Sequence, residues 1–381
     1  MRVAINVEQL LSPSPGGIGR YTAQLVMLLR SIAPADDPVP FVARHRPSEV
    51  AAALTGSGLG PSAVVLPFPR PLLYETWVRF GLPALRWGAP ELRGVDLVHA
   101  PSVAVPGRSP APLVVTVHDA APELFPDAFT PRGRRWHARG AAAAARRADL
   151  VIVPSAAAGE EVVELTPVPA ERVRVVHHAV CSPASPRPLD ASRRQALGIG
   201  DAPYVLWVGS LEPRKGLATL IEAMAALGPA GRRGCRLVLA GFPGWLPAGL
   251  VPDAARKSLG ADLLQVGRVD DATLWGLLAG AAVFAFPSRH EGFGLPPLEA
   301  MSQGAPVVAS DLPVLREVLG PAALYVPPGR AEAWAARIAE LLGDDGARAE
   351  MSAAGRARAA LFDPERFVGD TRTVYREVLG G

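Results

Sequence analysis

This 381-residue sequence has few cysteines and a small net charge. Cys181 and Cys235 form neither a CxxC pair nor a disulfide framework, so we expect the protein to work in a reducing compartment. The 39 basic side chains barely exceed the 36 acidic ones, and a net charge of +3 gives no reason to predict binding to nucleic acid. A disulfide-stapled secreted protein and a nucleic-acid-binding protein are therefore disfavoured.

Long apolar runs are missing as well. The longest apolar stretches, such as residues 276–287, are shorter than the roughly 18–20 residues that a membrane-spanning helix needs. The first residues, MRVAINVEQL, hold no basic stretch followed by a long apolar one, so they do not predict a signal peptide. We expect a cytoplasmic protein, with peripheral contact at the inner membrane face as its closest approach to lipid.

Motifs for metals and for common cofactors are absent too. The sequence contains no HExxH, no metal-type Cys/His spacing and no D-x-D, so no metal site is predicted. In SPGGIGRYT, Gly16, Gly17 and Gly19 resemble a phosphate-binding turn before a helix. However, Thr22 stands where the dinucleotide fingerprint needs its last glycine. A bound nicotinamide, flavin or P-loop nucleotide is therefore not expected, and no cofactor is predicted.

Short, near-continuous apolar runs recur along the whole chain, as in strands buried on both faces of a parallel sheet. In the first half these predicted strands are residues 3–7, 39–43, 63–66, 96–100, 113–118, 150–154 and 173–177. In the second half they are residues 204–209, 236–241, 263–267, 282–287, 306–310 and 323–326. The sequence thus predicts two sheets.

Helical patterns separate many of these strands, which indicates α/β units with right-handed crossovers. The clearest predicted helices cover residues 19–30, 131–147, 217–226, 271–279, 332–342 and 347–361. A stretch rich in Pro and polar residues, 181–200, is interpreted as a linker. We predict one domain over residues 1–185 and a second over 186–363. A final helix within residues 364–381 is free to pack back on the first domain.

The densest candidate site is AVFAFPSRHEGFGLPPLEAMSQGAPVVASD, where a predicted strand ends before a loop and a helix that starts near Leu295. Glu291 and Glu299 bracket this turn with E-x7-E spacing, and carboxylates accept hydrogen bonds from sugar hydroxyls. Gly292 and Gly294 allow a ligand to approach the backbone closely. The alternative is an exposed loop carboxylate and a second one on a helix surface.

Cations follow another strand in YVLWVGSLEPRKG. Arg214 and Lys215 suit a pyrophosphate, or they are two solvated loop cations. In VVTVHD, His118 stands at a strand end and suits a sugar contact, although a lone histidine is more often a half-buried structural one; His99 is a weaker candidate. The Arg- and aromatic-rich residues 70–87 predict an amphipathic helix over its own sheet or, alternatively, contact with an anionic membrane.

Together these motifs resemble the family 4 retaining glycosyltransferases, which have the GT-B fold. The resemblance rests on HEGFGLPPLEAMSQGAPVVASD and extends in order through GGIGRYT, HAPS, VTVHD, ADLVIVPS, VGSLEPRKGL, LAGFPGW and ALYVPP. It implies an α/β architecture of two Rossmann-like domains whose parallel sheets face a central cleft. The first domain would bind the acceptor and the second a nucleotide-sugar.

The resemblance also implies a role for each matching residue. Glu299 would contact the ribose and Glu291 the transferred sugar, with His118 near the reacting sugar. The catalytic group would be Glu291, His118, Lys215 and Arg214. The donor-binding residues would be Gly16, Gly17, Ser210, Arg214, Lys215, Val266, Arg268, Glu291, Gly292, Phe293, Gly294, Leu295 and Glu299. Many relatives carry Arg at the position of Ser210, so this sequence places more of the diphosphate charge on Arg214 and Lys215.

The resemblance favours metal-independent, retaining transfer of a hexose to a glycan, glycolipid or small-molecule acceptor. Mannose from GDP-mannose is the first expectation and UDP-glucose the next. A nucleotide-sugar epimerase or a sugar phosphorylase on the same fold is an alternative, although no acid/base pair beyond His118 is visible for an epimerase. A non-catalytic two-lobed sugar-binding protein is the second alternative.

Overall fold

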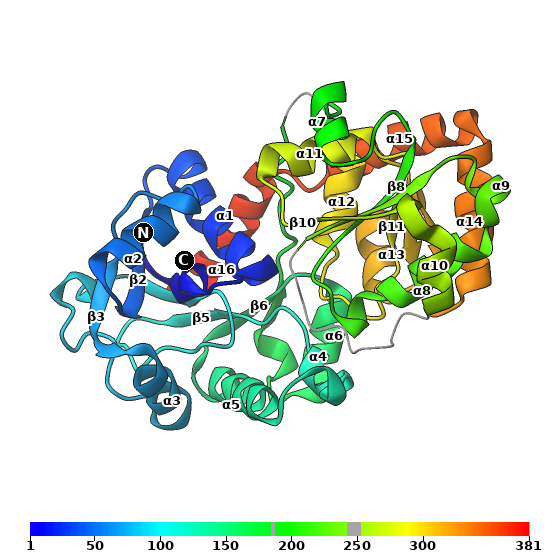
Figure 1. The fold of residues 1–381 in the computed structure, drawn as a ribbon. Coiled ribbons are helices and arrows are strands. Elements are labelled where there is room, and N and C mark those ends of the chain that lie inside the picture. Colours follow the sequence, from blue (N-terminus) through cyan, green and yellow to red (C-terminus); the bar gives the residue numbers. More distant parts are fainter. Residues whose placement is uncertain (184–186, 242–252, 381) are drawn as a thin grey trace. The chain divides into compact units, whose positions relative to one another are not determined.

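The computed structural model describes residues 1–183, 187–241 and 253–380, which form two compact units. Unit 1 comprises residues 1–179 together with 364–381, and unit 2 comprises residues 180–363. The boundary thus follows Ala179, whereas the sequence analysis placed it near residue 185. The chain returns to unit 1 for its last helix (Figure 1). The predicted LAGFPGW motif lies largely outside the described residues.

Unit 1 contains a seven-stranded parallel sheet in the order β3-β2-β1-β4-β5-β6-β7. Figure 1 shows α3 and α5 on one face of this sheet and α1 and α16 on the other. The strands are β1 Arg2–Asn6, β2 Asp37–Arg44, β3 Val64–Pro69, β4 Leu97–Ala100, β5 Leu113–Thr116, β6 Leu150–Val153 and β7 Val173–Val175. The helices are α1 Gly16–Ile32, α2 Pro47–Gly56, α3 Arg70–Phe80, α4 Ala121–Leu124, α5 Pro131–Arg147, α6 Ala156–Leu165 and α16 Pro364–Leu379.

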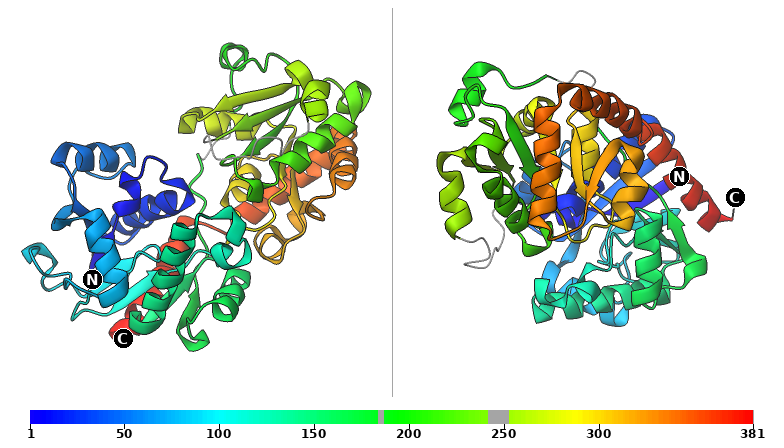
Figure 2. Two further views of the ribbon diagram at one scale, coloured as in Figure 1. Left: turned by 60° about the horizontal axis from the view of Figure 1, so that its bottom comes forward. Right: turned by 90° about the vertical axis from the view of Figure 1, so that its right-hand side faces the viewer.

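Unit 2 contains a six-stranded parallel sheet in the order β10-β9-β8-β11-β12-β13. Figure 2 shows this unit, coloured from green to orange, from two further sides. The strands are β8 Tyr204–Val208, β9 Arg236–Ala240, β10 Leu263–Gly267, β11 Val283–Phe286, β12 Val307–Ser310 and β13 Ala323–Val326. The helices are α7 Ala191–Ala196, α8 Leu217–Ala226, α9 Gly228–Arg232, α10 Asp253–Leu259, α11 Asp271–Gly280, α12 Leu295–Ser302, α13 Pro313–Leu319, α14 Ala331–Gly343 and α15 Asp345–Ala359.

Each predicted strand corresponds to a strand of the structure. β4, β6, β11 and β12 are buried at every position, as the near-continuous apolar runs predict for a sheet covered on both faces. The linker prediction for residues 181–200 is wrong in its second part, where α7 forms. Asp190 caps this helix by accepting a hydrogen bond from the Arg193 amide at 2.7 Å. The predicted start of α1 is also wrong, because the helix begins at Gly16 and not at residue 19.

The strand orders locate the ligand-binding edge of each sheet. In unit 1 the strand order reverses between β1 and β4: strands that follow β1 are added on one side and strands that follow β4 on the other. In unit 2 the order reverses in the same way between β8 and β11. Open α/β sheets bind ligands at such switch points, outside the carboxyl ends of the strands. The loops after β8 and β11, and those after β1, β4 and β5, are therefore where functional side chains are expected.

Candidate active site

Two glycines bring the loops of unit 2 together at its switch point. Gly216 follows a short 3-10 turn, Pro213–Lys215, and has a φ of +67°. A Cβ atom added to it would lie 1.9 Å from the carbonyl oxygen of Pro287, which ends the β11 segment. Gly241 makes the same kind of approach to Gly209, with 1.8 Å between an added Cβ and the Gly209 oxygen. Glycine is needed at both positions because any side chain would separate the loops.

This close approach places Lys215 against Glu291. The Lys215 ammonium donates a hydrogen bond to Glu291 Oε1 at 2.7 Å, and both side chains are largely buried, at 16% and 10% exposure. Arg214 donates to the backbone oxygen of His290 at 3.0 Å, and the Arg289 amide donates back to the Arg214 oxygen at 2.8 Å. The residues predicted from two separate motifs thus form one cluster.

The charges of the cluster keep Glu291 ionised. Burial by itself opposes ionisation, but the Lys215 and Arg214 charges and the Lys215 hydrogen bond outweigh it. The pKa of the Glu291 carboxyl is therefore below its ordinary value. Neither carboxylate of the E-x7-E pair is exposed, so the alternative of a surface loop and a surface helix carboxylate is wrong. Two solvated loop cations are likewise excluded by the burial of Lys215 and its ion pair.

The backbone of the following turn faces the same edge. Gly294 has a φ of +96° and immediately precedes α12, whose start at Leu295 is as predicted. Glu299 lies one turn into α12 and is buried, as are Gly292 and Phe293 beside Glu291. Pro296 and Pro297, in the first turn of α12, lack an N–H group, so any amide that contacts an anionic or polar ligand here belongs to the residues up to Leu295. This turn therefore supplies both amides and carboxylates at one place.

Two predicted residues lie at the edge of unit 2. Val266 is the fourth residue of β10 and Arg268 directly follows that strand, which is the outermost on its side of the sheet. Ser210 follows β8 and donates a hydrogen bond to Glu212 Oε1 at 2.7 Å. Glu212 also lies 3.4 Å from the Arg214 guanidinium. The sequence analysis missed Glu212, although its position between Ser210 and Arg214 is a signal for this contact.

In unit 1, Gly16 and Gly17 form the exposed first turn of α1. Gly16 has a φ of +61°, and no heavy atom of the described residues lies within 4 Å of a Cβ added to either glycine. This end of a 17-residue helix is thus open, and its amides are available to an anion. Both glycines follow β1, at the switch point of the sheet.

His118 follows β5 and is half-buried. Its Nε2 lies 2.8 Å from the Pro101 carbonyl oxygen, in the loop after β4. A carbonyl only accepts hydrogen bonds, so Nε2 carries a proton and Nδ1 is the acceptor of the neutral ring. Burial lowers the pKa of His118, while the Pro101 carbonyl and the Asp119 charge act in the opposite direction. His118 is therefore a neutral hydrogen-bond acceptor at neutral pH.

The comparison with known proteins decides the family. The profile described as Glycosyl transferases group 1 matches residues 190–358, and the one described as Glycosyltransferase Family 4 matches residues 15–181. The O-antigen chain mannosyltransferase B of Escherichia coli is 31% identical, with 99% of this chain and 100% of that protein aligned. The chain belongs to glycosyltransferase family 4.

Other relatives of this glycosyltransferase align over a smaller share of their length. The D-inositol 3-phosphate glycosyltransferase of Jonesia denitrificans is 31% identical over 69% of this chain and 66% of its own length. The serotype-specific mannosyltransferase WbdA of Escherichia coli is 32% identical over 58% of this chain and 28% of its own length. Family membership makes the protein a hexosyltransferase and selects that function over an epimerase, a phosphorylase or a non-catalytic binding protein.

Solved structures confirm the fold of this glycosyltransferase. Sucrose-phosphate synthase from Thermosynechococcus elongatus superposes with a TM-score of 0.74 at 25% identity, over 100% of this chain and 99% of that one. Anabaena Alr3699/HepE in complex with UDP and glucose gives a TM-score of 0.73 at 20% identity, over 99% and 100%. The predicted GT-B architecture of two Rossmann-like domains is thus confirmed.

Proposed function

We propose that this glycosyltransferase moves mannose from GDP-mannose to an acceptor with retention of anomeric configuration and without a metal. The observation that carries the proposal is the buried Lys215–Glu291 pair at the β8/β11 switch point. It combines a cation for the diphosphate with a carboxylate for sugar hydroxyls. Full-length similarity to a mannosyltransferase supports mannose, and UDP-glucose is the next donor to test.

Each site residue receives a role in this proposal. Lys215 and Arg214 offset the charge of the departing diphosphate, and the amides of the Gly292–Leu295 turn add hydrogen bonds. Glu291 accepts hydrogen bonds from hydroxyls of the sugar. Glu299 binds the ribose, and the neighbourhood of Val266 and Arg268 binds the base. Ser210 supports this arrangement through Glu212.

Unit 1 is proposed to contribute Gly16, Gly17 and His118. The open amides of the first α1 turn suit the diphosphate, and the free Nδ1 acceptor of His118 suits a sugar hydroxyl. The acceptor hydroxyl would attack on the face from which the diphosphate leaves. The bond from the anomeric carbon to the diphosphate oxygen breaks while the new glycosidic bond forms, and the proton of the acceptor hydroxyl passes to the departing diphosphate oxygen. The charge that develops on the leaving oxygen is balanced by Lys215 and Arg214.

A thermal-shift panel with GDP, UDP, ADP, dTDP and their sugars in EDTA tests the donor. A nucleotide at 100 times its Kd stabilises a protein by about 2.7 kcal/mol, so the matching base gives a clear shift. We expect GDP and GDP-mannose to shift the unfolding temperature most. The anomeric coupling constant of the product, measured by NMR, tests retention. A shift that needs Mg²⁺, or a product of inverted configuration, contradicts the proposal.

The acceptor is proposed to be a glycan end carried on lipid, reached at an anionic membrane. The support is a surface of unit 1 around the end of α3. Phe80, Leu82 and Trp87 expose 63%, 49% and 59% of their surface within eight residues. Backbone hydrogen bonds from Arg108 to Gly81 and from Leu85 to Arg108 join this segment to the loop before β5.

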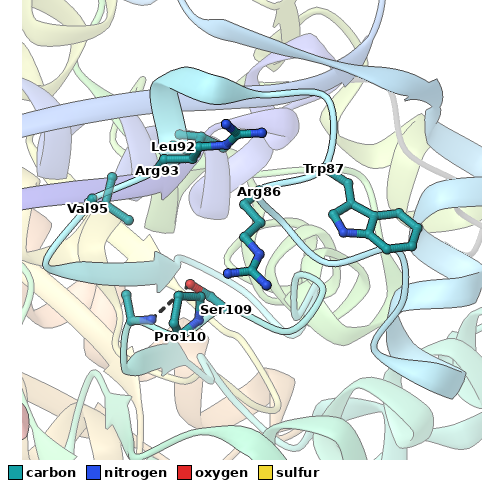
Figure 3. A pocket seen from close by; sticks show the side chains of 9 residues that line it. Arg86, Trp87, Leu92, Arg93, Val95, Ser109 and Pro110 are labelled. Atoms are coloured by element: carbon teal, nitrogen blue, oxygen red, sulfur yellow. Dashed lines mark hydrogen bonds between the residues drawn. The ribbon is translucent and has the colours of Figure 1, made fainter.

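Arginines accompany these apolar side chains. Arg86 and Arg93 line a cavity of about 400 Å³ next to Trp87 (Figure 3), and Arg79 is exposed nearby in sequence. Arginine with aromatic residues is the composition that binds anionic lipid surfaces. The amphipathic-helix interpretation holds for the first part of residues 70–87, because Tyr74 and Trp77 are buried against the sheet. Among the described residues, no helix is long and apolar enough to cross a membrane.

Co-sedimentation of the full chain with vesicles tests this surface. We expect binding to vesicles of phosphatidylcholine with phosphatidylglycerol, weakened by salt, and none to phosphatidylcholine alone. The variant Phe80→Ser/Trp87→Ser should lose binding to the vesicles. The control variant Leu379→Ser, which changes an exposed apolar residue outside this surface, should keep it. Equal binding of both variants to the vesicles contradicts the membrane proposal. A wild-type dimer in solution that Phe80→Ser/Trp87→Ser dissociates also contradicts it, because the surface would then bind a second copy of the chain.

A further inference from the structure

A chain of three hydrogen bonds crosses the core of unit 1. The Tyr375 hydroxyl lies 2.6 Å from His99 Nδ1, and His99 Nε2 lies 2.8 Å from Thr116 Oγ1. Thr116 Oγ1 in turn lies 3.0 Å from the Tyr21 hydroxyl. The four residues come from α16, β4, β5 and α1, so the chain joins the last helix of the protein to its first one.

All four side chains are buried, and none of them changes charge near neutral pH. Burial lowers the pKa of His99 to about 3. Burial also raises the pKa of the Tyr21 and Tyr375 hydroxyls above their ordinary value. The chain therefore carries no charge near neutral pH. Burying four polar groups is costly unless they are bonded to one another, and phenylalanine would fill the same space at the tyrosine positions.

Tyr21 connects this chain to the proposed active-site residues of unit 1. Its ring meets His118 edge-on, with 4.9 Å between ring centroids and an interplanar angle of 83°. The same ring lies 4.7 Å from that of His178, and His178 lies 5.5 Å from His118. Tyr21 also stands in the second turn of α1, whose first turn holds Gly16 and Gly17.

Thr116 is the last residue of β5 and lies two residues before His118 in the sequence. Its bond to Tyr21 therefore joins the end of β5 to the start of α1. His118 itself is bonded at Nε2 to Pro101, which leaves the tilt of its ring to be set by the neighbouring rings. The direction of the Nδ1 acceptor thus depends on where the Tyr21 ring is held.

We propose that Tyr21, Thr116, His99 and Tyr375 are positioning residues that orient His118 and the first turn of α1 for glycosyl transfer. This inference rests on the proposed function of His118. It gives α16 a part in catalysis through Tyr375, although that helix holds no residue of the predicted site. The Tyr21 hydroxyl, which anchors the ring against His118, is the group whose removal tests the proposal most directly.

Tyr21→Phe removes one hydroxyl and keeps the ring. The matched control is Tyr74→Phe in the same unit, because the Tyr74 hydroxyl is also buried and donates to Asn6 Oδ1 at 2.9 Å, but the ring packs on Trp77. We expect Tyr21→Phe to lower kcat about tenfold with the donor KM changed less than twofold, and Tyr74→Phe to leave kcat within about twofold. Tyr375→Phe should lower kcat in the same sense by a smaller factor.

A double-mutant cycle separates positioning from general loosening. In a His118→Ala background, the effect of Tyr21→Phe on kcat should shrink to less than about twofold, because the group it orients is gone. The same tenfold loss in that background would overturn the proposal. Equal losses for Tyr21→Phe and Tyr74→Phe would also overturn it.

Histidine ring NMR on the full chain provides a readout that needs no turnover. The His118 signal is assigned by its absence in His118→Ala. We expect Tyr21→Phe to move the His118 titration midpoint and its Nδ1 shift, and Tyr74→Phe to leave both unchanged. An unmoved His118 signal overturns the positioning role even if transfer is observed. If the wild type transfers no sugar and Tyr21→Phe still moves the His118 signal, only the proposed function is refuted.

Discussion

Replacing Lys215 by alanine probes both the stability and the chemistry of the unit 2 cluster. At 2.7 Å and an effective dielectric constant near 20, the attraction between Lys215 and Glu291 is roughly 6 kcal/mol before desolvation. The cost of burying both charges cancels much of that gain. Removing one partner leaves the other charge buried, so we expect Lys215→Ala to lower the free energy of unfolding by about 2–4 kcal/mol at pH 7.

The pH dependence of that loss has a definite sign. In the wild type the folded-state pKa of Glu291 is depressed. The stability from the pair is therefore present above the unfolded pKa, about 4.3, and is lost as pH falls through the folded value. Without Lys215, the largest influence on Glu291 is burial, which raises its pKa. The deficit of Lys215→Ala should thus be greatest at neutral pH and shrink toward pH 5.

Urea unfolding at pH 7 and pH 5, with kcat measured in parallel, checks this reasoning. Lys257→Ala is the matched control, because Lys257 is the only other lysine of the sequence and is exposed on α10. The double variant Lys215→Ala/Glu291→Gln should recover most of the stability, since neither member of the pair is left as an unpaired buried charge. It should recover none of the activity, for which we expect about 10²–10³-fold lower kcat.

Three results would refute the argument. Lys215→Ala with wild-type stability would mean that the ion pair contributes nothing net. A deficit that grows toward acid would mean that Glu291 is not the group left unpaired. Near-normal turnover of Lys215→Ala would remove Lys215 from the proposed leaving-group contacts.

Further predictions concern backbone and core positions. Gly216→Ala should destabilise unit 2 by about 3 kcal/mol or more in thermal unfolding, because an added Cβ would meet the Pro287 oxygen at 1.9 Å in a left-handed backbone conformation. Gly17→Ala has open space around it, so the unfolding temperature should stay unchanged while donor titration shows weaker binding; unchanged donor affinity would argue against the proposed role. Trp334→Ala should cost about 3–5 kcal/mol by urea unfolding, since that ring is fully buried in the unit 2 core.

Much of the fold was predictable because its signals are local. A strand that is buried on both faces must be apolar at nearly every position, and each predicted strand appears in the structure. Helices such as α5, bounded by Thr130 and Pro131 at its start, carry their limits in the sequence. Short helices were missed, among them α9 and α13, because five and seven residues cover too few turns to show a helical period.

The candidate site was predictable in its residues but not in its contacts. Glu291, Lys215 and Arg214 could be named because glycines, prolines and charges cluster after predicted strands. Lys215 and Glu291 are 76 positions apart in the sequence, and they pair because β8 and β11 are neighbours in the strand order of the sheet. The missed contact of Glu212 depends on the local 3-10 turn after β8.

The sequence by itself determined the class of elements, the two sheets and the family, because hydrophobic period and short motifs are properties of neighbouring residues. Only the tertiary structure decided that α16 belongs to unit 1 and places Tyr375 against His99, 276 positions earlier. It also decided that Tyr74 and Trp77 are core residues while Phe80 and Trp87 are exposed. Burial and hydrogen bonding between distant segments depend on how sheets and helices pack, and no local pattern specifies that packing.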